Sequence, residues 1–284
     1  MNAPVAEDAA VESTSRRSKH GRPEPNRSLL RGTEILRAFR PGIDVLGNSE
    51  IAERTGLSKA TISRLTQTLV RAGFLEHVAD RRAYRLAGFV LSLGHAMRVG
   101  SPILALAGPR MRAASQRLRV NVGLAIADRD AMVYLESVRY NAKASLRSIV
   151  AGLRVPVELT SLGRAYLATL SNAERHALSA QVQAYRPRGW KWPEREVDAA
   201  VASVLKHGYC AAAWQPGVVA IAAPLVKPNW PTYVLNMSVG TAAPPAGVAR
   251  RLKGDLLALR DELLDEMSLL GGEHQHVQRR STQG

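Results

Sequence analysis

The chain of 284 residues has a net charge of +15 and is long enough to form two domains with separate hydrophobic cores. This charge favours a polyanionic partner, and we expect nucleic acid before an anionic membrane. The longest apolar run, Val218–Val226, has the length of a strand and falls short of the roughly 20 residues of a membrane span. One cysteine, Cys210, excludes an intramolecular disulfide and predicts a cytoplasmic protein.

The chain begins with a polar stretch and a first helix. Residues 1–26 balance four basic against four acidic groups and show no hydrophobic periodicity, which predicts a disordered arm and no signal peptide. In residues 28–39 the apolar side chains recur at helical spacing, and Arg40-Pro41-Gly42 ends that helix.

Residues 50–65 are the most informative stretch, because they match a helix, a tight turn and a second helix. Ala52 is small where two helices would cross, Gly56 supplies the backbone freedom of the turn, and Ser58 can cap the second helix. This arrangement predicts a DNA-binding helix-turn-helix. The residues expected to contact DNA from it are Ser58, Lys59, Thr61, Ser63, Arg64 and Gln67.

Two short alternating segments, Phe74–Val78 and Ala83–Leu86, follow as a predicted hairpin. Three helices and a hairpin make residues 27–87 a winged helix-turn-helix domain. Arg81 and Arg82 lie at the tip of the wing, where we expect them to meet the DNA backbone or minor groove.

The rest of the chain predicts a linker helix over 88–108, an α+β domain over 109–271 and a flexible tail over 272–284. The apolar face of the linker suggests dimer contacts, and Gly100-Ser101-Pro102 should kink or end its helix. The expected strands are Val122–Ala127, Ala131–Val138, Ser145–Ala151, Val218–Leu225 and Tyr233–Val239. The expected helices are Pro109–Leu118, Ser161–Leu170, Asn172–Gln183, Glu194–His207 and Ala246–Leu270.

Motifs for catalysis or cofactor binding are missing from the sequence. It contains no G-x-G-x-x-G, no G-x-x-x-x-G-K-[ST], no G-x-S-x-G and no H-E-x-x-H. The histidines are dispersed, and only His274 and His276 are close, in a polar segment. We therefore name no catalytic residue, no metal site and no cofactor, and we expect no enzyme.

Over residues 27–270 the sequence resembles the IclR family of bacterial transcriptional regulators. The resemblance implies a winged N-terminal domain, a linker helix and a GAF-like effector-binding domain. It also implies homodimers or dimers of dimers on palindromic operators. The motifs that carry it are Ser28-Leu-x-Arg31-Gly32, Ala52-Glu-Arg54-Thr55-Gly56-Leu57-Ser58-Lys59-Ala60-Thr61, Tyr84-Arg85-Leu86, Leu91-x-Leu93-Gly94, Gly163-Arg164-Ala165, Gly208-Tyr209 and Ala222-Ala223-Pro224. Leu235-Asn236-x-Ser238 looks most like the branch that regulates aromatic-acid catabolism.

The second domain also departs from the family pattern. Glu158 stands where a histidine is frequent, Arg164 stands for a lysine, and residues 210–215 replace an acidic run. Carried over motif by motif, the resemblance implies an effector pocket lined by Val155, Ser161, Leu162, Ala220, Asn236 and Ser238. Asn236 and Ser238 lie two apart on one strand and so face the same side; with backbone N–H groups near 160–162 they can bind a carboxylate.

The favoured hypothesis is a ligand-responsive transcriptional regulator whose effector is a small anionic metabolite, such as an aromatic carboxylate. A second hypothesis is an enzyme for small molecules fused to a DNA-binding domain, which turnover of candidate acids would support. A third is a constitutive DNA-binding architectural protein whose second domain binds no ligand, and a thermal-shift screen would distinguish it.

Overall fold

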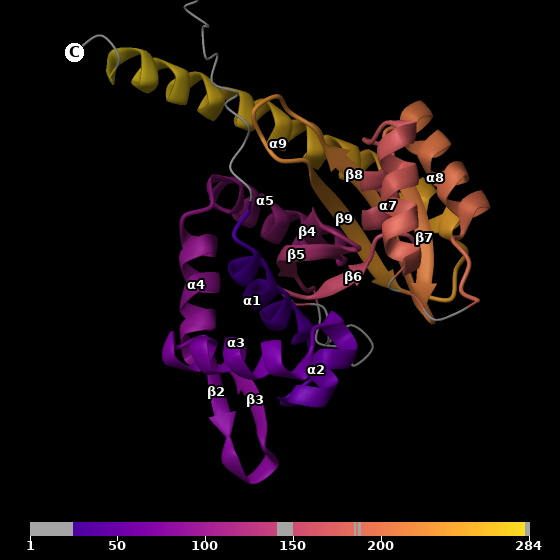
Figure 1. Cartoon of the computed structure of the whole chain (residues 1–284). Coiled ribbons are helices and arrows are strands. Elements are labelled where there is room, and N and C mark those ends of the chain that lie inside the picture. The colour runs from indigo at the N-terminus through magenta and orange to yellow at the C-terminus, as the bar shows by residue number, and fades with distance from the viewer. Residues whose placement is uncertain (1–24, 141–149, 185, 187–188, 282–284) are drawn as a thin grey trace, which may run out of the picture. The chain divides into compact units, whose positions relative to one another are not determined.

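In the computed structural model, residues 25–140, 150–184, 186 and 189–281 are described. The chain divides at Gly88 into two compact units (Figure 1). Nearly all of the expected arm over 1–26 and of the expected strand Ser145–Ala151 lies outside the described residues.

The first unit is a winged helix-turn-helix, as predicted. It contains α1 (Arg27–Ala38), β1 (Leu46–Gly47), α2 (Asn48–Thr55), α3 (Lys59–Arg71), β2 (Leu75–Val78) and β3 (Ala83–Leu86). The strands form an antiparallel sheet in the order β1-β3-β2, and β2 and β3 make the wing. A single core holds the unit together. Its fully buried large side chains are Ile35, Leu46, Ile51, Ile62 and Leu75.

Local capping explains where these helices begin and end. Asn26 Oδ1 accepts a hydrogen bond from Leu29 N at 3.1 Å and caps α1. The carboxylate of Glu50 accepts from Gly47 N at 2.8 Å at the start of α2. Gly56 ends α2 in the left-handed conformation (φ 69°), which glycine adopts without the steric cost of a Cβ. The turn between α2 and α3 therefore has the chemistry that the sequence predicted.

In its described residues the second unit is a six-stranded antiparallel sheet with helices on both faces, in the order β6-β5-β4-β9-β8-β7. Its strands are β4 (Asn121–Asp128), β5 (Ala131–Val138), β6 (Arg154–Pro156), β7 (Cys210–Gln215), β8 (Val218–Leu225) and β9 (Tyr233–Gly240). Its helices are α4 (Gly88–Val99), α5 (Pro102–Leu118), α6 (Ser161–Leu167), α7 (Asn172–Ala184), α8 (Glu194–His207) and α9 (Pro245–Ser281).

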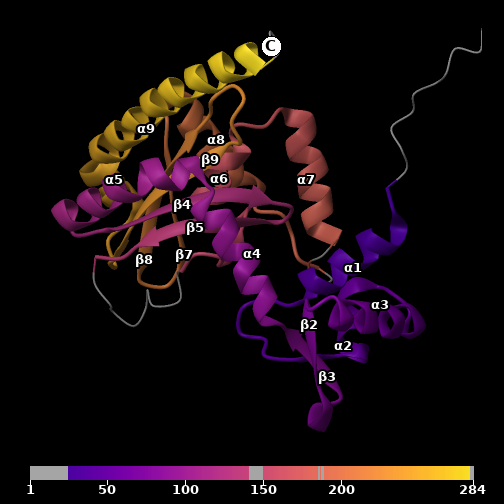
Figure 2. The ribbon, with the colours of Figure 1, turned by 90° about the vertical axis from the view of Figure 1, so that its left-hand side faces the viewer.

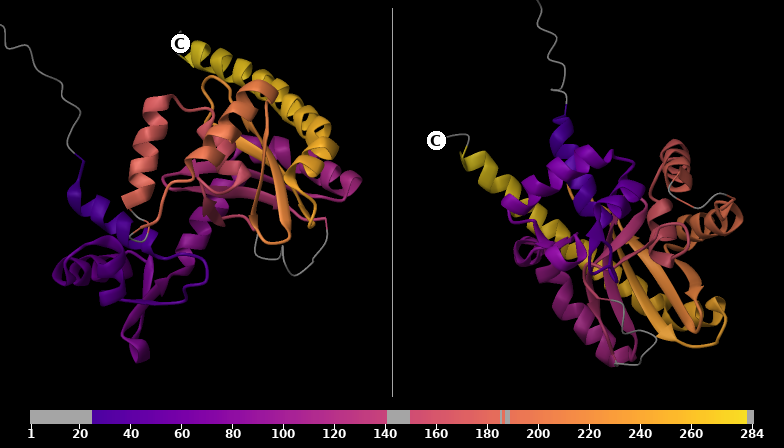
Figure 3. Two further views of the ribbon diagram at one scale, coloured as in Figure 1. Left: turned by 90° about the vertical axis from the view of Figure 1, so that its right-hand side faces the viewer. Right: turned by 60° about the horizontal axis from the view of Figure 1, so that its bottom comes forward.

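Two hydrophobic cores lie on opposite faces of this sheet. Helices α5 and α9 cover one face, where Ile103, Met111, Leu256 and Leu263 pack on alternate strand residues (Figure 2). The other face is covered by α6 and α8, and α7 contributes Val182 to the same core (Figure 3). We call this second face the α6 face; every effector candidate predicted from the sequence lies on it or in α6 itself.

Several elements differ from the sequence prediction. The structure has strands β1, β6 and β7, which were not predicted, because two are very short and Cys210–Gln215 is rich in alanine. Helix α5 is continuous from Pro102 and contains Pro109, whereas a separate helix from Pro109 was expected. Burial of Ile103, Ala107 and Met111 holds α5 together despite the hydrogen bond that a proline removes. Helix α9 extends to Ser281, beyond the expected end at Leu270.

Among the described residues, no helix is by itself long and apolar enough to cross a membrane. Helices α4 and α5 meet that criterion only when taken together, and they are bent by 78° at their junction. The bend falls at Gly100-Ser101-Pro102, where the sequence predicted a kink or an end.

Candidate DNA-binding face and effector site

Helix α3 begins with a cap that uses two of the predicted DNA contacts. The Ser58 hydroxyl accepts a hydrogen bond from Thr61 N at 3.3 Å and lies 2.9 Å from Thr61 Oγ1. Ser58 is exposed and Thr61 is half-buried. Both side chains therefore fix the start of the helix, and they remain near its surface.

The outer face of α3 carries most of the other predicted contacts. Lys59, Arg64 and Gln67 are exposed, Ser63 is half-buried, and Ile62 and Thr66 are buried on the opposite side. The helix thus presents two cations and an amide to solvent along its length. Groups of these kinds are the ones that proteins use to bind phosphates and the edges of bases in a major groove.

The wing adds the two predicted arginines at its tip. Arg81 and Arg82 are exposed, and Arg82 adopts a left-handed conformation (φ 46°) at the turn. Arg81 Nη1 lies 3.4 Å from Asp44 Oδ2, with both side chains more than half exposed. Such a surface ion pair contributes about 0–1 kcal/mol to stability, so Arg81 can leave Asp44 and bind another anion at little cost.

Sequence reasoning missed other exposed residues on the same helix, namely Ala60, Thr68 and Arg71. Ala60 and Arg71 stand four residues before and seven residues after Arg64, which is the spacing of one helix face. That spacing was available from the sequence. Thr68 donates its hydroxyl to Arg64 O at 3.0 Å, so its side chain serves the helix backbone.

In the second unit the structure brings the six effector candidates to one side. Val155, Ser161, Leu162, Asn236 and Ser238 are each 4% exposed or less, and Ala220 is half-buried. Ala220 stands directly opposite Ser238 on neighbouring strands, and Ala222 stands opposite Asn236. The candidates from β8 and β9 therefore form adjacent rows on the α6 face, and alanine is the neighbour of each polar residue.

Asn236 is fixed by a neighbour that the sequence did not indicate. Its Nδ2 donates to Tyr134 Oη at 3.3 Å, and its Oδ1 lies over Gly123 without a hydrogen-bond partner. Burial raises the pKa of Tyr134 to about 12, although the Asn236 hydrogen bond opposes the rise. Tyr134 thus stays protonated and positions the amide on the sheet. No local pattern in the sequence points to this contact, because the two residues are 102 positions apart.

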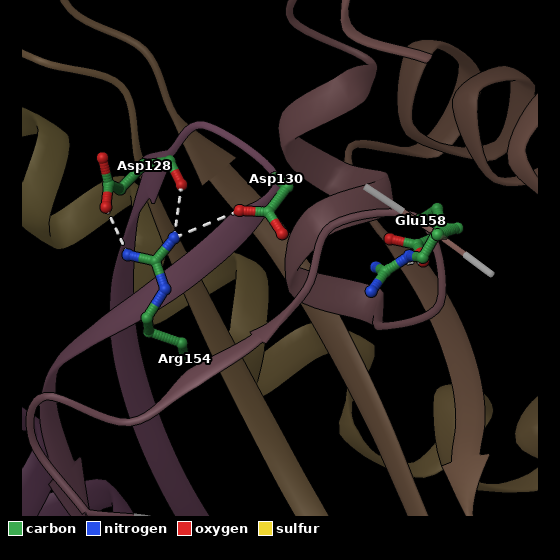
Figure 4. Close-up of polar contacts among 5 residues, drawn as sticks. Asp128, Asp130, Arg154 and Glu158 are labelled. Carbon is green, nitrogen blue, oxygen red and sulfur yellow. Dashed lines mark hydrogen bonds and ion pairs between the residues drawn. The ribbon is translucent and has the colours of Figure 1, made fainter. Parts of the chain in front are cut away.

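The residues that depart from the family pattern contact one another before α6. Glu158 is fully buried, and its Oε1 accepts a hydrogen bond from Arg186 Nη2 at 2.5 Å. Arg164 Nε donates to Glu158 O at 3.0 Å, and desolvation lowers the pKa of Arg164. Figure 4 shows Glu158 at this turn. The ion pair between Arg186 and Glu158 ties Arg186 to the turn before α6, the helix in which Ser161 and Leu162 lie.

A second cluster anchors β6, which carries Val155. Arg154 forms an ion pair with Asp128, donates to Asp128 O at 2.9 Å and lies 3.3 Å from Asp130 Oδ1 (Figure 4). These contacts attach the short strand to the turn between β4 and β5. The effector candidate on β6 is therefore held by charge pairing as well as by three backbone pairings with β5.

Cys210 connects the edge strand β7 to α6. It is buried, its Sγ donates to Ser161 O at 3.4 Å, and burial raises the pKa of the thiol to about 12. A protonated buried thiol is unreactive. The described part of the chain brings together no group of three or more His, Cys, Asp or Glu residues able to hold a metal ion.

Each of the two units matches a known protein family. Residues 28–79 match the family model "IclR helix-turn-helix domain", and residues 95–242 match "Bacterial transcriptional regulator IclR C-terminal". The chain has an N-terminal DNA-binding domain and a C-terminal α/β domain of one class of bacterial regulator. It belongs to the IclR family of transcriptional regulators.

Individual relatives support this assignment. The regulator TsaQ1/TsaQ2 of Comamonas testosteroni is 33% identical over 183 residues, which cover 64% of this chain and 66% of that protein. The Pca regulon regulatory protein of Pseudomonas putida is 28% identical, covering 65% and 69%. The crystal structure of an IclR-family regulator from Brucella abortus is 32% identical with a TM-score of 0.73, covering 93% of this chain and 96% of that one. The alignments with these two curated relatives thus span about two thirds of their length.

Proposed function

We propose that this chain binds a palindromic operator through α3 and the wing. The observation that carries the proposal is the exposure of Lys59, Arg64 and Gln67 to solvent on the second helix of a helix-turn-helix. In this motif the second helix enters the major groove. Arg81 and Arg82, at the tip of the wing, contact the flanking backbone or minor groove, and the cap residues Ser58 and Thr61 lie at the end of α3 nearest the bases.

A palindrome requires two copies of the chain, and α4 is the surface that we assign to pairing. No residue of this helix is buried, although it carries large apolar side chains. Phe89 is 47% exposed, Leu91 79% and Met97 52%. With large apolar side chains exposed on more than one side, α4 offers an apolar surface that a second copy of the chain would cover. The assembly is a homodimer or a dimer of dimers, and we place it in the cytoplasm.

The second unit binds a small anionic metabolite, an aromatic carboxylate in this proposal, on its α6 face. Support comes from the buried polar residues there, Ser161, Asn236 and Ser238, whose hydroxyl and amide groups include hydrogen-bond donors. A structural neighbour from Microbacterium hydrocarbonoxydans, 23% identical with a TM-score of 0.60, was crystallised with 4-hydroxybenzoate. At that identity it is evidence for the fold, and its ligand is simply the first compound to test.

The effector acts by changing the arrangement of the two DNA-binding units in the dimer. It shifts the balance between two arrangements only as far as its affinities for them differ. A thermal-shift screen of aromatic acids tests this step, because a ligand at 100 times its dissociation constant stabilises its protein by about 2.7 kcal/mol. Stabilisation with no product in the mixture supports a sensor, and conversion of the acid supports an enzyme instead.

The DNA-binding step is tested by selecting duplexes from a randomised library with the full chain and measuring affinity by fluorescence anisotropy. Arg64→Ala should weaken the selected duplex by about 1–3 kcal/mol and relax its sequence preference at one position. The matched control is Arg251→Ala, which removes an exposed arginine from α9. Failure to enrich any sequence, or equal affinity of wild type and Arg64→Ala, contradicts the assignment of α3.

A further inference from the structure

The exposed face of α3 contains one apolar residue, Ala60, among polar ones. At 3.6 residues per turn, Ala60, Arg64, Gln67 and Arg71 fall on one face of the helix. All four are exposed, whereas Ile62 on the opposite side is fully buried. Ala60 therefore lies one turn before Arg64 on the surface that we assign to DNA.

The position of Ala60 gives its methyl group a restricted set of partners. In a helix-turn-helix the N-terminal part of the recognition helix meets the edges of bases, and Ala60 is the second residue of α3. The major groove offers one apolar group, the C5-methyl of thymine. Against a purine edge or the amino group of cytosine, an alanine methyl would cover a donor or acceptor and give it no hydrogen bond in place of water.

We propose that Ala60 reads a thymine in each operator half-site through its C5-methyl, next to a guanine read by Arg64. One helical turn advances 5.4 Å and base pairs stack at about 3.4 Å, so the two contacts fall one or two base pairs apart. This inference rests on the proposed DNA-binding role of α3. It adds a base preference that the charged residues of the helix do not supply.

The experiment exchanges single thymines for deoxyuridine in the duplex selected by the full chain. This exchange removes only the C5-methyl group. Loss of one buried methyl contact should weaken binding about fourfold per half-site at one thymine position. Ala60→Gly should weaken the thymine duplex by a similar factor and should bind the thymine and uracil duplexes equally.

Two further variants keep the test independent of helix stability. Ala72→Gly, at the C-terminal cap of α3, should retain the wild-type preference for thymine. Ala60→Ser keeps a helix-compatible side chain and should reduce the thymine preference below twofold. The inference is overturned if every thymine tolerates uracil, or if both Ala60 variants still discriminate. If no duplex is enriched at all, the proposed function falls as well.

Discussion

Replacing Gly123 by alanine tests whether the interior of the α6 face is as tightly arranged as the structure indicates. A Cβ at this position would lie 2.5 Å from Tyr134 Cε1 and closer still to Asn236 Oδ1. Both neighbours are at most 5% exposed, so neither has free space to move into. The alanine must therefore displace the amide and weaken its hydrogen bond to Tyr134.

The expected loss of stability follows from three effects. Overpacking of a core costs about 1–3 kcal/mol, and a lost hydrogen bond costs about 1 kcal/mol. A strand gains about 0.5–1 kcal/mol when alanine replaces glycine. We therefore expect Gly123→Ala to lower the free energy of unfolding of the second unit by about 1–3 kcal/mol, measured by urea denaturation. Duplex binding without effector should persist, and the thermal shift by an aromatic acid should shrink.

A matched substitution separates the packing effect from the general effect of alanine. Gly254 lies on the exposed surface of α9, and a Cβ there would meet no atom within 4 Å. Gly254→Ala should raise the free energy of unfolding by about 0.5–1 kcal/mol, because alanine favours a helix. If Gly123→Ala is as stable as wild type, the arrangement of Tyr134 and Asn236 described above is wrong.

Three other outcomes are expected. Arg186→Met should lower the free energy of unfolding, measured by urea titration, by about 3 kcal/mol, because it leaves the Glu158 carboxylate buried and unpaired. Adding Glu158→Gln should restore part of this loss, and no restoration would argue against the ion pair. Between pH 9 and about pH 12 the unfolded chain loses the Cys210 proton while the folded chain keeps it, so the free energy of unfolding should fall as pH rises. Cys210→Ala should make this fall with pH less steep. An unchanged pH dependence would be inconsistent with the raised pKa of the thiol. Leu91→Glu should dissociate the dimer in sedimentation equilibrium, whereas the equally exposed Leu205→Glu on α8 should not; an intact Leu91→Glu dimer would refute pairing through α4.

The first unit was predictable from sequence because its signals are local. Apolar spacing, Gly56 at the turn and Ser58 at the cap each act within a few residues, and the structure has the expected helices and hairpin there. The strands β4, β5, β8 and β9 were also predictable, since each is an eight-residue segment rich in apolar residues and bounded by turns.

The interior of the second unit was not predictable in the same way. Its central contacts join distant parts of the chain, such as Asn236 with Tyr134 and Glu158 with Arg186. The β7 edge strand gave no alternating pattern, because alanine fits both faces of a strand. Family resemblance supplied a list of positions for the effector site. The structure shows which polar atoms at those positions already have a hydrogen-bond partner and which have none.

Chemical protection of guanine N7 on the selected duplex tests the central claim most directly, because this atom lies in the major groove where Arg64 is placed. Protected guanines are expected in two half-sites separated by one helical turn or a multiple of it, and Arg64→Ala should lose one protection per half-site. A bound complex in which no major-groove guanine is protected, or in which Arg64→Ala protects the same guanines as wild type, would contradict the assignment of α3 to the major groove.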